Sequence, residues 1–331
     1  MTNTFQENDI RPLNFKEKQN KVLEKDIEYL LSNKADFVRV NCPACGEEND
    51  DVKFCKNGFE YVECSSCTML YIPLRPSFET LKDFYANSVN YKFFNDYIFP
   101  SSLEVRREKI FIPRVKNVLK ICEEFNVPKT NILEIGAGYG IFLEEMMKKN
   151  LFESVMGVEA SDSLYERSNK MGFSVYNGVF EELEIDRKFS VIVSFEVIEH
   201  IFNPKQFIKK IFKVLENNGI LIMTFPNYNG FDISTLMEVS DSVDHEHLNY
   251  FNESSITMLL SEVGFKNIEI STPGVMDVDL VRNKIIEGSF KPNPFIQDLC
   301  ASENKEVGDV FQQFLIDNKL SSNMMVLARK I

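Results

Sequence analysis

Short apolar runs separated by longer stretches recur through the second half of the chain. Each run has the length of a strand buried on both faces, and the stretches between them are long enough for helices. This alternation predicts an α/β fold with a doubly wound, Rossmann-like sheet. The expected strands cover residues 132–135, 156–158, 174–176, 189–194, 219–224, 265–270 and 323–329. Helices are expected at 103–125 and 141–150, on either side of the first strand.

Three glycines at alternate positions follow the first strand, at Gly136, Gly138 and Gly140. A residue without Cβ can adopt positive φ and lets a ligand lie against the backbone. The helix that follows would direct its first amides at the turn, which favours a carboxylate or phosphate there. The turn is therefore a candidate cofactor cradle, although such a turn by itself can also be structural. A dinucleotide fingerprint would need glycine at position 141, where the chain has Ile141.

With Glu134 inside the strand, the motif has the form E-x-G-x-G-x-G. It resembles the first motif of class I S-adenosylmethionine-dependent methyltransferases. The next strand ends in Glu159, at about the separation at which an acidic residue meets ribose hydroxyls in nucleotide-binding units. The fourth strand leads into residues 194–200, SFEVIEH, which is similar to the fourth-strand motif of small-molecule and sugar methyltransferases.

This resemblance implies S-adenosylmethionine as the cofactor and a seven-stranded sheet whose last strand returns antiparallel between the fifth and the sixth. The residues expected to bind the cofactor are Glu134, Gly136, Gly138, Gly140, Glu159, Ser194 and Glu196. One segment departs from the family pattern. Where an aspartate often contacts the adenine amino group, this chain has residues 177–180, NGVF, so that contact must come from the backbone or elsewhere.

Two C-x-x-C pairs lie near the N-terminus, separated by residues 46–63. Four thiolates from two such turns can surround one zinc ion tetrahedrally. The expected ligands are Cys42, Cys45, Cys64 and Cys67. A shell of four cysteines leaves no open position, so structural zinc in a zinc ribbon is expected. Disulfides are the alternative, which a reducing compartment disfavours.

The sequence after the second pair resembles the N-terminal module of bacterial methyltransferases from polysaccharide and sugar-nucleotide pathways. The resemblance covers roughly residues 41–271. We expect a helical segment at 1–40 with an amphipathic helix at 15–31, a zinc ribbon at 41–75, an aromatic-rich helical connector at 76–130, and a methyltransferase domain at 131–331 with a helical insertion at 272–320. The insertion is expected to form a substrate lid or a contact in a homodimer. Within it, Asp277 and Asp279 are candidates either for binding sugar hydroxyls or for capping a helix.

The three histidines of the chain, His200, His245 and His247, all fall in loops expected at one edge of the sheet. Histidine is the usual base at neutral pH. Residues 246–251, EHLNYF, resemble the E-H-L-x-Y-F segment of zinc-containing sugar C-methyltransferases, in which the histidine is implicated as the base and the glutamate as its neighbour. The resemblance implies His247 as the base, Glu246 as its support and His200 as a residue that assists or orients the acceptor.

Other interpretations of these histidines stay open. Each could be a structural loop residue, and the H-x-H pair together with Asp244 and Glu246 could bind a metal ion. The related C-methyltransferases often carry tyrosine where this chain has Asp244, and this departure weakens the interpretation as a C-methyltransferase in particular.

The charge and the hydropathy of the chain argue against nucleic-acid binding, a membrane span and a secretory signal. The formal net charge is −13 and the sequence pI is about 4.9, so the average surface repels the phosphates on which nucleic-acid binding depends. No apolar run reaches 18 residues, which predicts no membrane span, and residues 1–18 lack the apolar core of a secretory signal. A cytoplasmic protein is therefore expected.

These patterns together predict an enzyme that transfers a methyl group from S-adenosylmethionine to the oxygen or carbon of a small polar acceptor, such as a sugar or nucleotide-linked sugar. One alternative is an RNA or protein methyltransferase that docks its substrate on the zinc ribbon. Another is a non-catalytic S-adenosylmethionine-binding scaffold.

Overall fold

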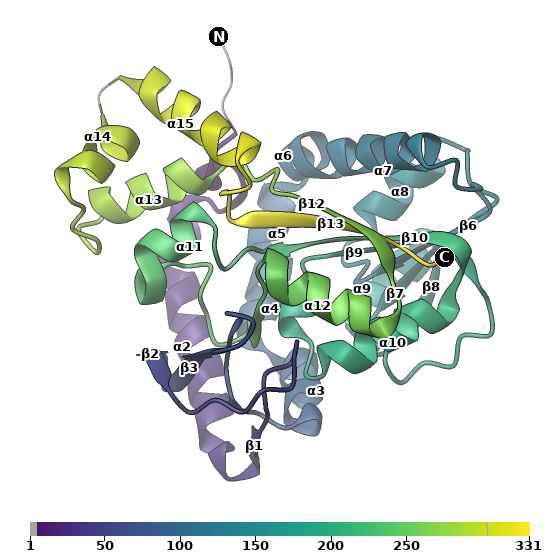
Figure 1. Ribbon diagram of the computed structural model, residues 1–331, viewed down its shortest axis with the longest axis horizontal. Coiled ribbons are helices and arrows are strands. Elements are labelled where there is room, and N and C mark those ends of the chain that lie inside the picture. Colours follow the sequence, from purple (N-terminus) through teal and green to yellow (C-terminus); the bar gives the residue numbers. More distant parts are fainter. Residues whose placement is uncertain (1–4, 303) are drawn as a thin grey trace.

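A seven-stranded sheet organises the second half of the chain (Figure 1). The computed structural model describes residues 5–302 and 304–331. The strand order is β12-β13-β10-β9-β6-β7-β8. The strands are β6 Asn131–Ile135, β7 Ser154–Glu159, β8 Ser174–Asn177, β9 Phe189–Phe195, β10 Leu215–Pro226, β12 Lys266–Ser271 and β13 Asn323–Arg329. Strands β6 to β10 pair in parallel, whereas β13 pairs antiparallel with both β10 and β12. The expected fold class is confirmed, including the position of the last strand.

Helices bury both faces of this sheet, which explains why its central strands are apolar throughout. Alternate side chains of β9 point to opposite faces. Val191 and Val193 pack with α7 Ile112–Glu124 and α8 Ile141–Met147, whereas Ile192 packs with α10 Pro204–Val214 and α12 Glu253–Val263. Helix α9 Asp162–Lys170 connects β7 to β8. The parallel strands therefore all end at one edge, where the loops after them meet.

The cysteine-rich segment forms a second, smaller sheet with the strand order β11-β4-β3-β2. Its strands β2 Val52–Lys56, β3 Phe59–Glu63 and β4 Leu70–Tyr71 are consecutive, and a two-stranded ladder of β1 Val38–Arg39 with β5 Leu74–Arg75 flanks them. The remaining strand, β11 Asn249–Tyr250, comes from the loop before α12 and pairs antiparallel with β4. A loop of the large sheet is thus built into the cysteine module.

Helices from the first part of the chain lie before and after this module in the sequence, and those that carry Leu30 and Leu81 pack against it. They are α1 Glu7–Ile10, α2 Lys16–Ser32, α3 Phe78–Asn87, α4 Val89–Phe93, α5 Phe99–Ser101 and α6 Leu103–Arg106. The expected helix at 103–125 runs from α6 through a π-helical turn, Arg107–Phe111, into α7. Pro113 follows that turn, and its missing N–H accommodates the change in hydrogen bonding. No helix in the described parts of the chain has the length and apolarity needed to cross a bilayer.

Residues 272–320 contain α13 Asp277–Ile286, α14 Pro294–Ala301 and α15 Lys305–Asp317, which form a lobe beside α11 Phe231–Leu236 at the upper left of Figure 1. The lobe has its own small core, which includes Val281 and Cys300. The Asp277 carboxylate accepts hydrogen bonds from Ser322 N and Gln312 Nε2, and the Asp279 carboxylate accepts one from Glu7 N. Both candidate sugar-binding carboxylates are therefore engaged within the protein.

Candidate cofactor and acceptor site

The glycine turn after β6 adopts a backbone conformation that other residues avoid. Gly136, Gly138 and Gly140 have φ values of 82°, 53° and 72°. A Cβ atom at Gly136 would lie 2.6 Å from Val197 Cγ2, whereas one at Gly138 would meet nothing within 4 Å. The backbone at Gly136 therefore passes closely under the segment that follows β9, which only glycine permits.

Glu159, at the end of β7, faces this turn. Its two carboxylate oxygens accept hydrogen bonds from Gly138 N and Ser161 N, each at 2.7 Å. Burial raises the pKa of Glu159, and the amide hydrogen bonds oppose that effect. The structure thus brings this predicted residue to the glycine turn, with a carboxylate oriented by backbone amides.

Two further predicted residues present polar atoms that lack a partner in the described part of the chain. They are Oε2 of Glu134 and Oγ of Ser194, and both side chains are buried. Ser194 lies opposite Ile135 in the register of β6 and β9, so both atoms lie next to the turn. Burial raises the pKa of Glu134 well above its usual range. Unpartnered buried atoms of this kind are costly unless a ligand or water satisfies them.

A pocket of about 740 Å³, its open mouth included, lies over the turn. One wall comes from the ends of the parallel strands and the other from α3 and the loop after β9. Among its lining residues are Gly136, Glu159, Gly178, Phe180, Phe78, Leu81, Tyr85 and His200. The connector therefore closes the pocket, and residues 178–180, which follow β8, supply an apolar wall.

Tyr139, inside the glycine turn, ties the turn to the connector. Its ring stacks on Phe99 with centroids 3.9 Å apart, and its hydroxyl donates to Asn95 O. The Arg167 guanidinium lies over the Tyr139 ring, 4.8 Å from the ring centroid. Sequence reasoning passed over this residue because it occupies a variable position of the motif.

Glu196 lies at the same edge, but its carboxylate is engaged within the protein. Oε1 accepts from Thr224 Oγ1 at 2.6 Å, Arg114 Nη2 at 3.1 Å and Asn323 Nδ2 at 3.1 Å. Its backbone has a φ of 55°, unusual for a side chain of this size. The residue therefore fixes the turn after β9 and links it to α7, β10 and β13.

His200 and His247 come from different loops and meet at this edge, with ring centroids 4.6 Å apart. His200 Nδ1 lies 3.0 Å from Glu246 O, and His247 Nδ1 lies 2.9 Å from Ser242 O. A carbonyl oxygen can only accept, so each Nδ1 carries a proton, and in the neutral ring Nε2 is the nitrogen that keeps its lone pair. Burial, with a smaller effect of His247, lowers the pKa of His200 to about 3, so its ring is neutral.

Glu199 joins the two histidines. One ligating atom from each of the three side chains lies within 4.8 Å of the others. Glu199 is 1% exposed, its Oε2 has no partner among the described residues, and burial raises its pKa well above the usual range. The sequence analysis did not select this residue, although its place directly before His200 in the EVIEH motif was a signal.

The carboxylate of Glu246 points away from His247, toward the connector. Oε1 accepts from Asn90 Nδ2 at 3.2 Å and lies 3.8 Å from His245 Nε2. Burial, followed by the charge of Asp244, raises the pKa of Glu246 to about 8. Glu246 contacts the histidine pair through its backbone carbonyl, which accepts a hydrogen bond from His200 Nδ1.

His245 is fully buried between aromatic rings. Its ring lies 6.3 Å from that of Phe59 and 6.2 Å from that of Phe84, and neither ring nitrogen has a partner among the described residues. It therefore packs against the cysteine module. The grouping of both loop histidines with Asp244 and Glu246, left open above, does not match the cluster that the structure brings together.

Hydrogen bonds to Asp244 and Asn249 hold the loop that carries His247. Asp244 Oδ1 accepts from the backbone amides of Glu246 and His247, each at 2.9 Å. The Asn249 side-chain amide donates to the carbonyls of Ile198, Glu199 and Ile201 in the loop of His200. The two histidine loops are thereby fixed to each other.

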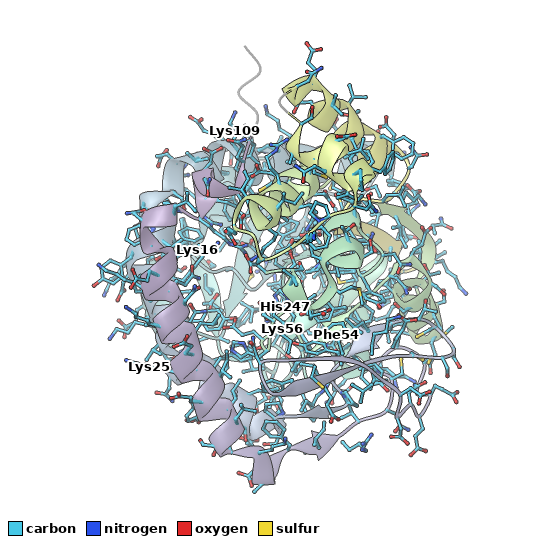
Figure 2. All side chains as sticks on the ribbon, turned by 90° about the vertical axis from the view of Figure 1, so that its left-hand side faces the viewer. Lys16, Lys25, Phe54, Lys56, Lys109 and His247 are labelled. Atoms are coloured by element: carbon cyan, nitrogen blue, oxygen red, sulfur yellow. The ribbon has the colours of Figure 1, made fainter. Side chains whose placement is uncertain are left out.

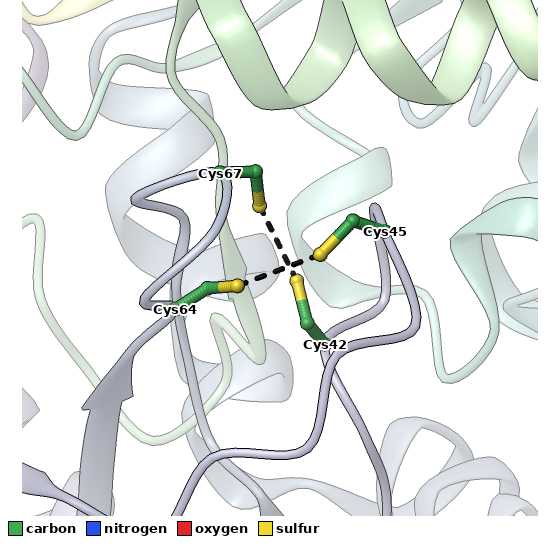
Figure 3. Close-up of side chains that lie close together, drawn as sticks. All are labelled: Cys42, Cys45, Cys64 and Cys67. Atoms are coloured by element: carbon green, nitrogen blue, oxygen red, sulfur yellow. Dashed lines mark hydrogen bonds between the residues drawn. The ribbon is translucent and has the colours of Figure 1, made fainter.

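The four cysteines gather as the sequence predicts (Figure 3). The Sγ atoms of Cys42 and Cys67 lie 3.4 Å apart, those of Cys45 and Cys64 lie 3.5 Å apart, and all four lie within 4.8 Å of one another. All are free thiols. Four sulfurs about 2.3 Å from a central ion have separations close to these, so the group fits a tetrahedral zinc ion. Asn252 donates to the Cys67 and Thr68 carbonyls and joins this cluster to the start of α12.

Comparison with known proteins gives consistent matches. The family model described as "Methyltransferase domain" matches residues 104–270, just over half of the chain. The ubiquinone biosynthesis O-methyltransferase of Rickettsia typhi is 27% identical over 179 residues, which cover 50% of this chain and 71% of that protein. The uncharacterized protein MJ1123 of Methanocaldococcus jannaschii is 25% identical over 173 residues, 52% of this chain and 82% of that protein.

A solved structure shows the same fold. The plantazolicin methyltransferase BpumL, in complex with SAH, superposes with a TM-score of 0.50 at 16% identity, covering 76% of this chain and 93% of that chain.

Proposed function

The chain belongs to the methyltransferase-domain family and is an S-adenosylmethionine-dependent methyltransferase, and from this premise we propose that it methylates a small polar acceptor, a sugar or nucleotide-linked sugar. The observation that carries the proposal is the pair of imidazoles whose ring centroids lie 4.6 Å apart, with His200 lining the pocket and His247 packed against His200. Such a pair suits an acceptor that must lose a proton.

We assign the cofactor to the pocket over the glycine turn. Glu159 would accept from the ribose hydroxyls, which requires its carboxylate to share or give up the amides that it now binds. Gly136 allows close approach of the cofactor, and Phe180 offers an apolar wall for the adenine. The unpartnered atoms of Glu134 and Ser194 would receive the polar groups of the methionine part.

In the proposed reaction, an acceptor hydroxyl attacks the sulfonium methyl group in line. The bond between sulfur and the methyl carbon breaks as the bond between oxygen and that carbon forms, and S-adenosylhomocysteine leaves with a neutral sulfur. The hydroxyl proton passes to His247 Nε2, while His200 orients the acceptor. Glu246 supports the pair through its backbone carbonyl, which accepts from His200 Nδ1. Positioning of this kind supplies much of the rate.

Acidic and amide side chains around the histidines support a polar acceptor. Asp244, which stands where related C-methyltransferases often carry tyrosine, caps the loop through two backbone amides. The departure from that tyrosine, rather than the loop cap, is what favours oxygen over carbon as the methylated atom. The four free thiols would hold a structural zinc ion, and such a site suits a reducing compartment, so we propose a cytoplasmic enzyme.

The helical lobe is our candidate for a homodimer contact. Exposed apolar side chains gather on its three helices, at Ile286, Phe295 and Val310. Light scattering of the purified protein would measure the oligomeric state directly.

The proposal is tested by methyl transfer. S-adenosylmethionine with a labelled methyl group is incubated with fractionated sugar nucleotides, and label is followed into the acceptor. His247→Ala is expected to lower turnover by about a hundredfold or more, because it removes the proton acceptor. His245→Phe is the matched control, since His245 lies among aromatic rings without a nitrogen partner in the described chain. Full turnover by His247→Ala with saturating acceptor contradicts the assignment.

A further inference from the structure

We propose that Glu199, His200 and His247 form a binding site for a divalent transition-metal ion at the acceptor side of the cofactor pocket, separate from the four cysteines. The inference rests on the proposed function only for the role of the ion, because ion binding itself follows from the geometry of the three side chains.

The three side chains come from two loops and converge on one point. Glu199 and His200 lie in the 3-10 turn after β9, and His247 lies in the loop before β11. One ligating atom from each falls within 4.8 Å of the other two. Ligand atoms about 2.0–2.2 Å from a common ion have separations smaller than this limit, so small side-chain rotations suffice.

The hydrogen bonds of the imidazoles prepare both rings for an ion. Each Nδ1 donates to a backbone carbonyl, Glu246 O for His200 and Ser242 O for His247. This is the arrangement that fixes the tautomer of metal-binding histidines and leaves Nε2 as the ligand atom. The two carbonyls belong to one loop, which the Asp244 carboxylate braces through two amides.

The carboxylate of Glu199 is the independent sign of a missing partner. Its side chain is almost fully buried, yet Oε2 has no hydrogen-bond partner among the described residues. A buried carboxylate oxygen without a donor is costly, and an ion held jointly with two imidazoles would satisfy it.

Two imidazoles and one carboxylate suit zinc, cobalt, iron or manganese as divalent ions and leave further coordination positions open. The acceptor hydroxyl would take one of these positions. Bound to the ion, it would ionise more readily and release its proton to water, and the alkoxide would then attack the methyl group. In that case His247 holds the ion, and the ion replaces its imidazole as the means of activating the acceptor.

Cobalt titration of the full-length protein, with zinc already in the cysteine cluster, tests the site. We expect one further equivalent of Co²⁺ to bind with visible d–d absorption and without the thiolate-to-cobalt band in the near ultraviolet. Glu199→Gln and His247→Asn should weaken this binding by more than about tenfold. Glu246→Gln is the matched control, because its carboxylate lies in the same loop but points toward Asn90, and it should bind cobalt as the wild type does.

Three results would overturn the proposal: no further equivalent of Co²⁺, a thiolate band from that equivalent, or unchanged binding by Glu199→Gln. Thermal unfolding and S-adenosylhomocysteine binding of each variant show that a loss is not due to misfolding. A chelation experiment separates this proposal from the proposed function. If turnover is unchanged after every ion except the cysteine-bound zinc is removed, the ion has no catalytic role, and the methyltransferase proposal with His247 as a free base stands.

Discussion

Arg75 Nη1 donates to Asn249 Oδ1 at 3.1 Å, and this buried bond joins the end of the cysteine module to the loop that carries His247. The Arg75 side chain also donates to the carbonyls of Ile72 and Leu248. Burial lowers the pKa of Arg75 to about 9. A buried guanidinium with carbonyl and amide partners is sensitive to the loss of any of them, so the module and the histidine loops act as one unit.

Replacing Asn249 should therefore disturb both stability and catalysis. Asn249→Ala leaves buried carbonyls and part of the Arg75 guanidinium unpaired, at about 1–3 kcal/mol for each unsatisfied group. We expect a clear loss in the free energy of unfolding in urea and a loss of turnover larger than the loss of S-adenosylmethionine affinity. Asn229→Ala, at an exposed position, is the control. Wild-type turnover by Asn249→Ala would refute this role.

The cysteine cluster should be needed for the geometry of the acceptor side. Cys64→Ser is expected to remove stoichiometric zinc and to lower turnover strongly, because β11 pairs with β4 and Asn252 binds the Cys67 carbonyl. Cofactor binding should fall much less, since the pocket is built mainly on the large sheet. Bound zinc, cofactor affinity and catalytic rate are measured on one sample by metal analysis, calorimetry and a turnover assay. Cys55→Ser changes an exposed thiol outside the cluster and should leave them unchanged.

Glu159 should govern cofactor affinity. Glu159→Gln removes a charged acceptor, and we expect the dissociation constant for S-adenosylmethionine to rise about 10- to 100-fold. Asp162→Asn alters a nearby carboxylate that binds Asn177 at 3.0 Å and should leave affinity near the wild-type value. If Glu159→Gln binds S-adenosylmethionine as tightly as the wild type does, the Glu159 carboxylate only accepts hydrogen bonds from the backbone amides and does not bind the cofactor.

Two glycine variants distinguish the cost of a side chain at positive φ from the cost of a clash with Val197. Gly136→Ala and Gly138→Ala both place a side chain at positive φ, at a cost of about 1–2 kcal/mol. Only the first also meets Val197, at 2.6 Å. Thermal unfolding should therefore show the larger destabilisation for Gly136→Ala, and Val197→Ala in the same chain should recover part of it. A larger effect at Gly138 would contradict the close approach seen at Gly136.

The sequence predicted the large sheet well because its strands are buried on both faces and read as apolar runs. It predicted the cysteine cluster because two C-x-x-C turns suffice to define it. It did not predict β11, since a two-residue strand leaves no periodicity and its pairing with β4 joins segments far apart in the chain. In this respect the fold depends on long-range contacts that no local pattern encodes.

The histidine site was only partly predictable for a related reason. Residues 245–247 are consecutive, but neighbouring side chains of a non-helical segment point to different sides. His245 enters the aromatic core, Glu246 faces Asn90, and His247 meets His200. Figure 2 shows His247 toward the centre of the molecule, whereas Lys16 and Lys25 lie along α2 at its margin. Only the tertiary arrangement reveals Glu199 as the carboxylate beside the pair.

Calorimetric titration of the zinc-loaded protein with S-adenosylmethionine and S-adenosylhomocysteine tests the central claim most directly, because every assignment depends on the pocket over the glycine turn. We expect one molecule of either ligand to bind per chain with a dissociation constant in the micromolar range, which corresponds to a binding free energy of about −8 kcal/mol, and we expect Gly136→Val to abolish this binding. A folded, zinc-loaded sample that binds neither ligand would contradict the account and leave the glycine turn with a structural role alone.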